Sequence, residues 1–193
     1  MTVLPDPGRP QPWPSDVYAA LLRRRIVVVS GPLTDEVATR AAAELMLLDA
    51  DAVDPVQLLL SSAGGDLDAA LMLAGTVDLV RGPVTAVAQG RLAGAALAPF
   101  AAAARRLAGR HSVLELTEPR SELAGRATEI ATGAARQLAQ LGHLHERVAA
   151  ASGRPVDLVA ADFRTGTLLT ADGAVAYGLV DALVPGGPLP GVG

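Results

Sequence analysis

Short apolar runs that suit buried β-strands alternate along this chain with segments of helical periodicity. The strand-like runs cover residues 26–30, 56–61, 84–88, 112–116 and 179–184. Strands joined by a helical crossover pair in parallel, because the crossover returns the chain to the same edge of the sheet. The alternation therefore predicts an α/β fold with a mainly parallel sheet.

Three polar residues stand where helices should begin. Thr34, Asp66 and Thr170 each precede a segment whose apolar residues recur at helical spacing, and their side-chain oxygens can accept hydrogen bonds from first-turn amides. The second of these helices should cover residues 67–80. The third should stop at Gly178, because glycine suits the left-handed position after a helix.

The longest helical pattern runs from about residue 126 to 151, and Gly153 should end it. Its apolar face comprises Ala127, Ile130, Ala134, Leu138, Leu141, His145 and Val148. A small α/β body cannot cover a stripe of this length. The helix is therefore expected to protrude and to contact another subunit.

Chain length limits the number of domains, and net charge limits the class of partner. With 193 residues, half of them apolar, we expect a single domain over residues 16–184. Residues 1–15 are rich in proline, and 185–193 in proline and glycine, so both ends are expected to be flexible arms. The 16 basic and 20 acidic side chains give a net charge of -4, which argues against nucleic acid as a partner.

The residue types that the sequence lacks exclude further classes of protein. Without cysteine there is no disulfide framework, thiolate nucleophile or Cys-based zinc site, and we expect neither a metal nor another cofactor. The longest apolar stretch, 92–104, contains Pro99 and is too short to span a membrane, so it should be a buried core element. The proline-rich start contains no secretory signal, and the expected location is the cytoplasm.

A glycine pair in the sequence SSAGGD, at 61–66, separates an apolar strand from a helix. Such a turn can expose backbone amides at a helix start and bind an anion or an oxyanion, or it can be an ordinary strand-to-helix turn. It lacks the lysine and the spacing of a phosphate-binding P-loop. A second glycine-rich turn, QGRLAGAAL at 89–97, also joins a strand to an apolar helix.

Four segments together resemble the caseinolytic (Clp) protease proteolytic subunits. They are DVYAALLRRRIVVVSGPLTDEVA at 16–38, VQLLLSSAGGDLDAALML at 56–73, GRATEI at 125–130 with the long helix after it, and TADGAVAYGLVDALV at 170–184. The resemblance implies the ClpP/crotonase-like fold of repeated β-β-α units, with the long helix as the family's protruding handle. It also implies stacked seven-membered rings, built from copies of this chain or with an active paralogue, to which an AAA+ unfoldase can dock.

The catalytic positions differ from those of the family. The family's serine lies in a G-Q-A-A-S-M-G turn, which reads GRLAGAA here, with Gly94 in the serine's place. Its histidine opens an H-Q-P triplet, which reads TEP here, with Thr117 first. Its aspartate opens D-R-F-L-S, which reads GTLLT here, with Gly166 first. Glycine has no reactive side chain and threonine is no base near neutral pH, so the triad is expected to be vacant.

Backbone donors survive such side-chain replacements. The resemblance assigns the oxyanion-hole amides to Gly65 and Ala95, so a pocket for an acyl or carboxylate group is expected to persist without turnover. The leading hypothesis is an inactive ring subunit with a structural or regulatory role. The alternative is a crotonase-like enzyme that combines these amides with a carboxylate base such as Asp66 or Glu118.

The remaining polar residues have structural interpretations. Four carboxylates are expected to be helix caps or solvated charges: Asp66, Asp68, Glu115 and Glu118. His143 and His145 lie two residues apart and cannot face one metal ion from a helix, and His145 should be packed or interfacial. Ser61 and Ser62 have no recognisable neighbouring base. The arginines at 23–25 are expected to be surface or interface charge.

Overall fold

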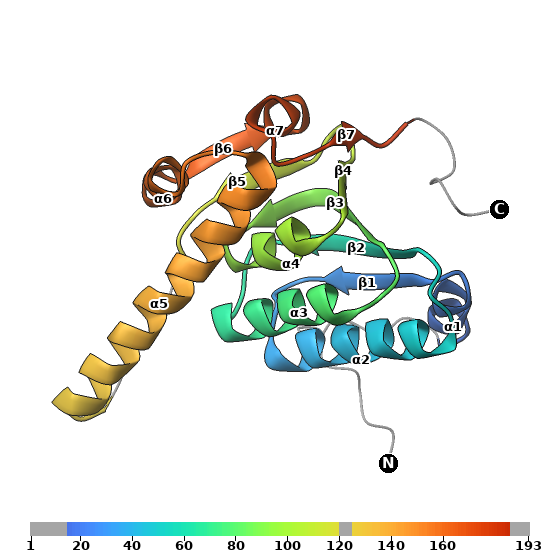
Figure 1. Ribbon diagram of the computed structural model, residues 1–193, viewed down its shortest axis with the longest axis horizontal. Helices are drawn as coiled ribbons and strands as arrows, with labels where there is room; N and C mark the ends of the chain where they lie inside the picture. The colour runs from blue at the N-terminus through green and yellow to red at the C-terminus, as the bar shows by residue number, and fades with distance from the viewer. Residues whose placement is uncertain (1–14, 120–124, 186–193) are drawn as a thin grey trace, which may run out of the picture.

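The computed structural model describes residues 15–119 and 125–185 (Figure 1). The predicted N-terminal arm (1–15) and C-terminal tail (185–193) lie outside the described residues, apart from Ser15 and Pro185. The helices are α1 (Ser15–Arg23), α2 (Asp35–Asp51), α3 (Leu67–Leu79), the 3-10 turn η1 (Gly94–Ala96), α4 (Leu97–Ala102), α5 (Ala127–Ser152), α6 (Val156–Thr165) and α7 (Ala171–Tyr177). The strands are β1 (Ile26–Ser30), β2 (Val56–Ser62), β3 (Val84–Ala93), β4 (Arg105–Ala108), β5 (Val113–Leu116), β6 (Thr167–Thr170) and β7 (Ala182–Leu183).

The strands form one mostly parallel sheet, which confirms the predicted α/β class. Strands β1, β2, β3, β4 and β7 follow one another in parallel. Strand β5 pairs in parallel with the end of β3, and β6 runs antiparallel beside β5. Helices α2, α3 and α4 cover one face of the sheet, while α6 and α7 lie beside β5 and β6 (Figure 1).

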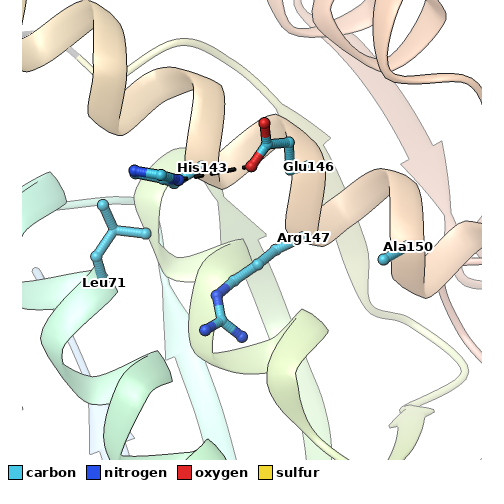
Figure 2. A pocket seen from close by; sticks show the side chains of 5 residues that line it. All are labelled: Leu71, His143, Glu146, Arg147 and Ala150. Atoms are coloured by element: carbon cyan, nitrogen blue, oxygen red, sulfur yellow. Dashed lines mark ion pairs between the residues drawn. The ribbon is translucent and has the colours of Figure 1, made fainter.

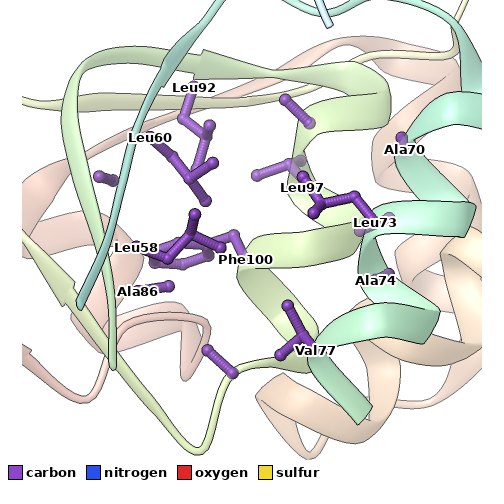
Figure 3. Packing of buried hydrophobic residues seen from close by; sticks show 14 of the residues in the cluster. Leu58, Leu60, Ala70, Leu73, Ala74, Val77, Ala86, Leu92, Leu97 and Phe100 are labelled. Atoms are coloured by element: carbon purple, nitrogen blue, oxygen red, sulfur yellow. The ribbon is translucent and has the colours of Figure 1, made fainter. Parts of the chain in front are cut away.

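The core lies between the sheet and these helices (Figure 3). Strand β2 alternates buried and half-buried residues along its whole length, as expected where one face packs more tightly than the other. Leu58 of β2, Leu73 of α3 and Phe100 of α4 are completely buried in this layer. Each contributes about 1.5–3 kcal/mol by leaving water. The predicted buried element at 92–104 is confirmed: it comprises the end of β3, the η1 turn and α4, and its residues 92–100 are all buried.

The second glycine-rich turn is shorter than predicted. Residues 89–93 continue β3 as strand, and the chain turns only at Gly94. The pairing of β3 with β2 shifts between Leu60 and Ser62, opposite the segment that contains Gly90 at φ +63°. This irregularity lets the strand bend and continue to pair with β5.

Helix α5 divides into a buried half and an exposed half. It begins one residue after the predicted start and ends at Gly153, whose φ of +70° is left-handed as expected. Its buried residues, Leu144, His145, Val148 and Ala149, all lie in the second half. Residues 125–132 are all exposed, and the helix projects from the body (Figure 1). No helix in the described part of the chain is long and apolar enough to cross a membrane.

One arginine expected at the surface has a structural role. The guanidinium of Arg25 donates to the carbonyls of Leu48 at 3.0 Å, Ala52 at 2.8 Å and Asp54 at 3.0 Å, and also to that of Pro55. These carbonyls end α2 and form its connection to β2, where a cation compensates the negative end of the helix. Arg25 itself has a φ of +57°, rare for a residue with a side chain.

Candidate functional site

Two strand-to-helix turns lie side by side at the carboxyl edge of the sheet. One joins β2 to α3 through Gly64 and Gly65, and the other joins β3 to η1 at Gly94. Strands β2 and β3 are parallel neighbours, with Ser62 opposite Leu92, so both turns leave the sheet at the same edge. A Cβ atom on Gly64 would lie 3.7 Å from the Ala93 carbonyl oxygen, so the two turns are in contact.

Hydrogen bonds from Ser62 and Leu33 fix the conformation of the first turn. The Ser62 hydroxyl donates to the Gly64 carbonyl at 2.8 Å and accepts from the Gly64 amide at 3.3 Å. The Leu33 amide donates to the same carbonyl at 2.9 Å, and Leu33 forms a parallel bridge with Gly65. A Cβ atom on Gly65 would lie 2.3 Å from the Leu33 carbonyl oxygen, so only glycine fits there. Ser62 therefore supports the turn and is 2 % exposed.

The second turn begins at Gly94, which is buried and has a φ of +55°. Ala95 and Ala96 follow it and are completely buried. A Cβ atom on Gly94 would point toward Thr117, at 3.3 Å from its carbonyl oxygen and 3.6 Å from its hydroxyl oxygen. A side chain at position 94 would thus face position 117.

Thr117 and Gly166 are brought together by the pairing of β5 with β6. Leu116 is opposite Thr167 in this antiparallel pair, which puts the residue after β5 beside the residue before β6. A Cβ atom on Gly166 would lie 3.7 Å from the Thr117 methyl carbon. Positions 94, 117 and 166 therefore converge in space, and the Thr117 hydroxyl is the one reactive side-chain group that they carry.

The four candidate carboxylates behave largely as structural groups. Asp66 accepts from the Ala69 amide at 2.9 Å and caps α3, as predicted. The Asp68 carboxylate accepts from Gln140 of α5, and that of Glu115 from the Arg91 guanidinium at 2.9 Å. Of the four, Glu118 alone is exposed beside the candidate site without a hydrogen bond to another described residue. This arrangement gives the crotonase-like alternative little support.

The three histidines lie in packed or surface positions. His145 is 8 % exposed, and its ring centroid lies 4.8 Å from that of Phe163 in α6. Burial lowers the pKa of His145 and the Arg164 charge lowers it further, while the Glu118 charge opposes this shift. His145 is thus a packed residue, as expected. His143 is exposed, with its Nδ1 atom 3.5 Å from Glu146, and His111 is exposed in the turn before β5.

A polar network that the sequence did not reveal holds the segment before Gly166. The Tyr177 hydroxyl donates to Asp162 at 2.7 Å, and the Thr167 hydroxyl donates to the other carboxylate oxygen at 3.3 Å. The Arg154 guanidinium stacks 3.9 Å above the Tyr177 ring centroid. Burial, followed by the hydrogen bond to Asp162, raises the pKa of Tyr177. Pairs this far apart in the sequence carry no local signal.

Two shallow surface depressions lie away from the three converging positions. One lies between α3 and α5 and is lined by Leu71, His143, Glu146, Arg147 and Ala150 (Figure 2). Arg147 is ion-paired there with Asp78 of α3. The other lies on the exposed half of α5. Both are surface features of the projecting helix.

The fold and the turns define a class: an α/β protein with a mostly parallel sheet, in which glycine-containing turns lead from β2 and from β3 into the helices that follow. The model of the family described as Clp protease matches residues 11–186. The chain belongs to the Clp protease family, which confirms the resemblance in the sequence. Members of this family form stacked rings and partner with unfoldases.

Proposed function

We propose that this protein is a catalytically inactive, cytoplasmic subunit of a Clp protease ring, with residues 16–184 as its single domain. The observation that carries the proposal is the convergence of Gly94, Thr117 and Gly166. Cβ atoms on Gly94 and Gly166 would lie 3.6 and 3.7 Å from side-chain atoms of Thr117, which supports assigning these positions to the nucleophile, base and orienting acid, and none of the three residues is a serine, histidine or aspartate. Such residues act as a unit, so losing all three removes the chemistry of the triad.

The backbone part of the site supports a remaining capacity to bind. In this proposal the amides of Gly65 and Ala95 are the oxyanion donors. Both belong to turns whose conformation depends on backbone contacts. The site would therefore hold a peptide carbonyl or a carboxylate without turning it over.

The exposed half of α5 supports assembly as the retained activity. Leu138 is 70 % exposed and Ile130 39 % exposed on this half, as expected for an apolar face that another subunit covers. Leu141, in contrast, packs partly on the protomer's own core. Leu138 is therefore the cleaner probe of assembly. The partners in this proposal are copies of this chain or an active paralogue, with an AAA+ unfoldase docking on the ring.

A fluorophosphonate probe and a short peptide ester test the missing chemistry. The purified protein should neither become labelled nor hydrolyse the ester above the rate of a heat-unfolded sample, because positions 94, 117 and 166 provide no nucleophile paired with a histidine base. An active Clp proteolytic subunit serves as the positive control. Stoichiometric labelling of Ser61, Ser62 or any other residue would overturn the proposal.

Native mass spectrometry after co-expression with an active paralogue tests the assembly. The wild-type chain should appear in ring-sized species, and Leu138→Arg should reduce them. The matched control is Val53→Arg, which places the same charge on a 52 % exposed position in the connection between α2 and β2. A wild-type protein that stays monomeric, alone and with the paralogue, contradicts the assembly role.

A further inference from the structure

Helix α1 contacts α2 through a small polar cluster formed by Tyr18, Arg40 and Glu44. The Tyr18 hydroxyl donates to the Oε1 atom of Glu44. The Arg40 side chain lies one helical turn before Glu44, with its Nε atom 3.5 Å from the same oxygen. The Arg40 guanidinium also lies 5.8 Å from the Tyr18 ring centroid. Both polar contacts of the carboxyl group thus fall on one of its oxygens.

The other oxygen of Glu44 is buried without a partner. Glu44 is 7 % exposed, and its Oε2 atom has no hydrogen bond among the described residues. An ionised carboxylate in this position is costly, because it loses its water on one side and gains no donor in return. This burial raises the pKa of Glu44 from its ordinary 4.5 to about 7.

The elements around Glu44 offer little further charge. Strand β1, which packs beneath α2, has the sequence IVVVS. On α3, Asp68 and Asp78 are engaged by Gln140 and Arg147 of α5. The Arg25 guanidinium is bound to carbonyls at the end of α2. The cation beside Glu44 is therefore Arg40, whose side chain is 47 % exposed and hence screened by water.

Few other contacts hold α1 on the body. Leu22, in its last turn, packs partly against the core. Val17, in its first turn, is 43 % exposed, and Asp16 and Arg23 are also exposed. Residues 18–22 are half-buried, and the bond between Tyr18 and Glu44 is the side-chain hydrogen bond that joins α1 to α2 in the described part of the chain.

We propose that the docking of α1 on α2 depends on a proton: α1 is docked while the Glu44 carboxyl group is neutral and is released as that group ionises. The sign follows from linkage. A carboxyl group that binds its proton more tightly in the docked state favours docking at low pH. Docking weakens as the pH rises from about 4.5 to about 7, and it is constant above that range.

Hydrogen exchange of the α1 amides, measured between pH 5 and 8 and corrected for the intrinsic rate, tests this inference. The protection factor of the α1 amides should fall by about tenfold per pH unit up to about pH 7, and then level off. Amides of β2 report global opening, so α1 protection that stays below theirs at every pH assigns the fall to local release of α1. Protection of α1 that stays constant across this range overturns the proposal.

Two neutral variants of α2 make the test specific. Glu44→Gln keeps the shape and the acceptor for Tyr18, so its α1 protection should not vary with pH. Glu36→Gln, at an exposed acid in the first turn of the same helix, should behave as the wild type does. The proposal is wrong if Glu44→Gln retains the fall or if Glu36→Gln abolishes it.

A third variant keeps the test decisive where Glu44→Gln does not fold. Tyr18→Phe removes the one donor from α1 and leaves Glu44 in place. The ionised carboxylate then lacks that hydrogen bond, so α1 protection should fall with pH at least as steeply as in the wild type. A flat profile at the protection of the wild type in Tyr18→Phe contradicts the inference, whereas α1 unprotected at every pH agrees with it.

Discussion

The two glycine turns at the edge of the sheet look alike in sequence but differ in why glycine is present. In the turn after β2, Gly65 lies against the backbone of Leu33, and any side chain there would overlap it. In the turn after β3, the space beside Gly94 opens toward Thr117, with 3.3 Å to the nearest atom. The first glycine is required by the fold, whereas the second is required mainly by its left-handed φ.

This difference between the two glycines distinguishes the loss of a backbone donor from the loss of a catalytic side chain. A turn held mainly by backbone contacts can keep its amide geometry when the side chains of a triad are replaced, which is why oxyanion donors can outlast a triad. A nucleophile position depends on one side chain, and replacing it with glycine leaves the surrounding backbone intact. Position 94, the proposed nucleophile position, is therefore open to substitution, and four predictions test this comparison.

Gly65→Ala should have the largest effect. The added Cβ atom would lie 2.3 Å from one backbone atom of Leu33 and 2.5 Å from another, so the bridge between the two segments must break. We expect a loss of at least about 3 kcal/mol in the free energy of unfolding, measured by urea titration. Gly75→Ala in α3, where the Cβ atom meets nothing within 4 Å, is the control and should stabilise by up to about 1 kcal/mol. Equal effects of the two substitutions would refute the distinction.

Ser62→Ala should rank second. The Ser62 hydroxyl bonds to both the amide and the carbonyl of Gly64, and the amide would lose its partner inside the protein. The expected cost is about 2 kcal/mol in the free energy of unfolding. Ser61→Ala, at the neighbouring half-buried serine, should cost less than about 0.5 kcal/mol. A neutral Ser62→Ala would mean that the turn does not depend on this side chain.

The triple change Gly94→Ser, Thr117→His and Gly166→Asp asks whether the vacancy can be refilled. Its peptidase rate should exceed that of the best single variant by at least about tenfold, equivalent to ~1.4 kcal/mol. The same triple variant with Asn at position 166 is the control, because an amide cannot stabilise the imidazolium. A folded triple variant no faster than its single variants would sink the assignment of these positions.

Gly94→Ala should have the smallest effect. Its φ of +55° costs a residue with a side chain about 1 kcal/mol, and the neighbouring Thr117 carbonyl has to shift only slightly. Thermal unfolding should give a midpoint only a few degrees below that of the wild type. A loss as large as that of Gly65→Ala would show that both turns need glycine for the same reason.

Local signals predicted the helices well and the short strands poorly. Thr34, Asp66 and Thr170 cap the helices for which they were assigned, with distances of 3.3, 2.9 and 3.1 Å to the amides they bind. A cap is a contact within one turn of the chain, so the sequence carries it. Gly153 and Gly178 end their helices with left-handed angles for the same reason.

The missed elements owe their structure to distant neighbours. Strand β4 has the sequence RRLA, and it forms because β3 and β7 pair with it on its two sides. Strand β6 has β5 as its partner. Helix α6 follows Pro155 without a side-chain cap, so nothing marked its start. Strand β7 is shorter than predicted because Leu179 and Val180 instead donate their amides to Ala174 at the end of α7.

The candidate site likewise combined positions visible in the sequence with contacts that only the fold reveals. The resemblance supplied the positions Gly94, Thr117 and Gly166, but their proximity depends on the pairing of β5 with β6, which no local pattern encodes. The structural roles of Arg25 and Asp162 are contacts across 23 or more and 15 residues of sequence, respectively. Side chains that act at such separations look like ordinary surface charge until the fold is known.

The division of α5 also determines how a copy of the protein without a partner is treated in the cell. The first half of α5, which has no buried residue and contains Gly133, opens at very little cost in free energy. An open segment is what cellular proteases cut, while a covered one escapes them. In the proposed ring, copies that find no partner would therefore be degraded first, and the amount of this chain would follow the number of ring positions that it can occupy.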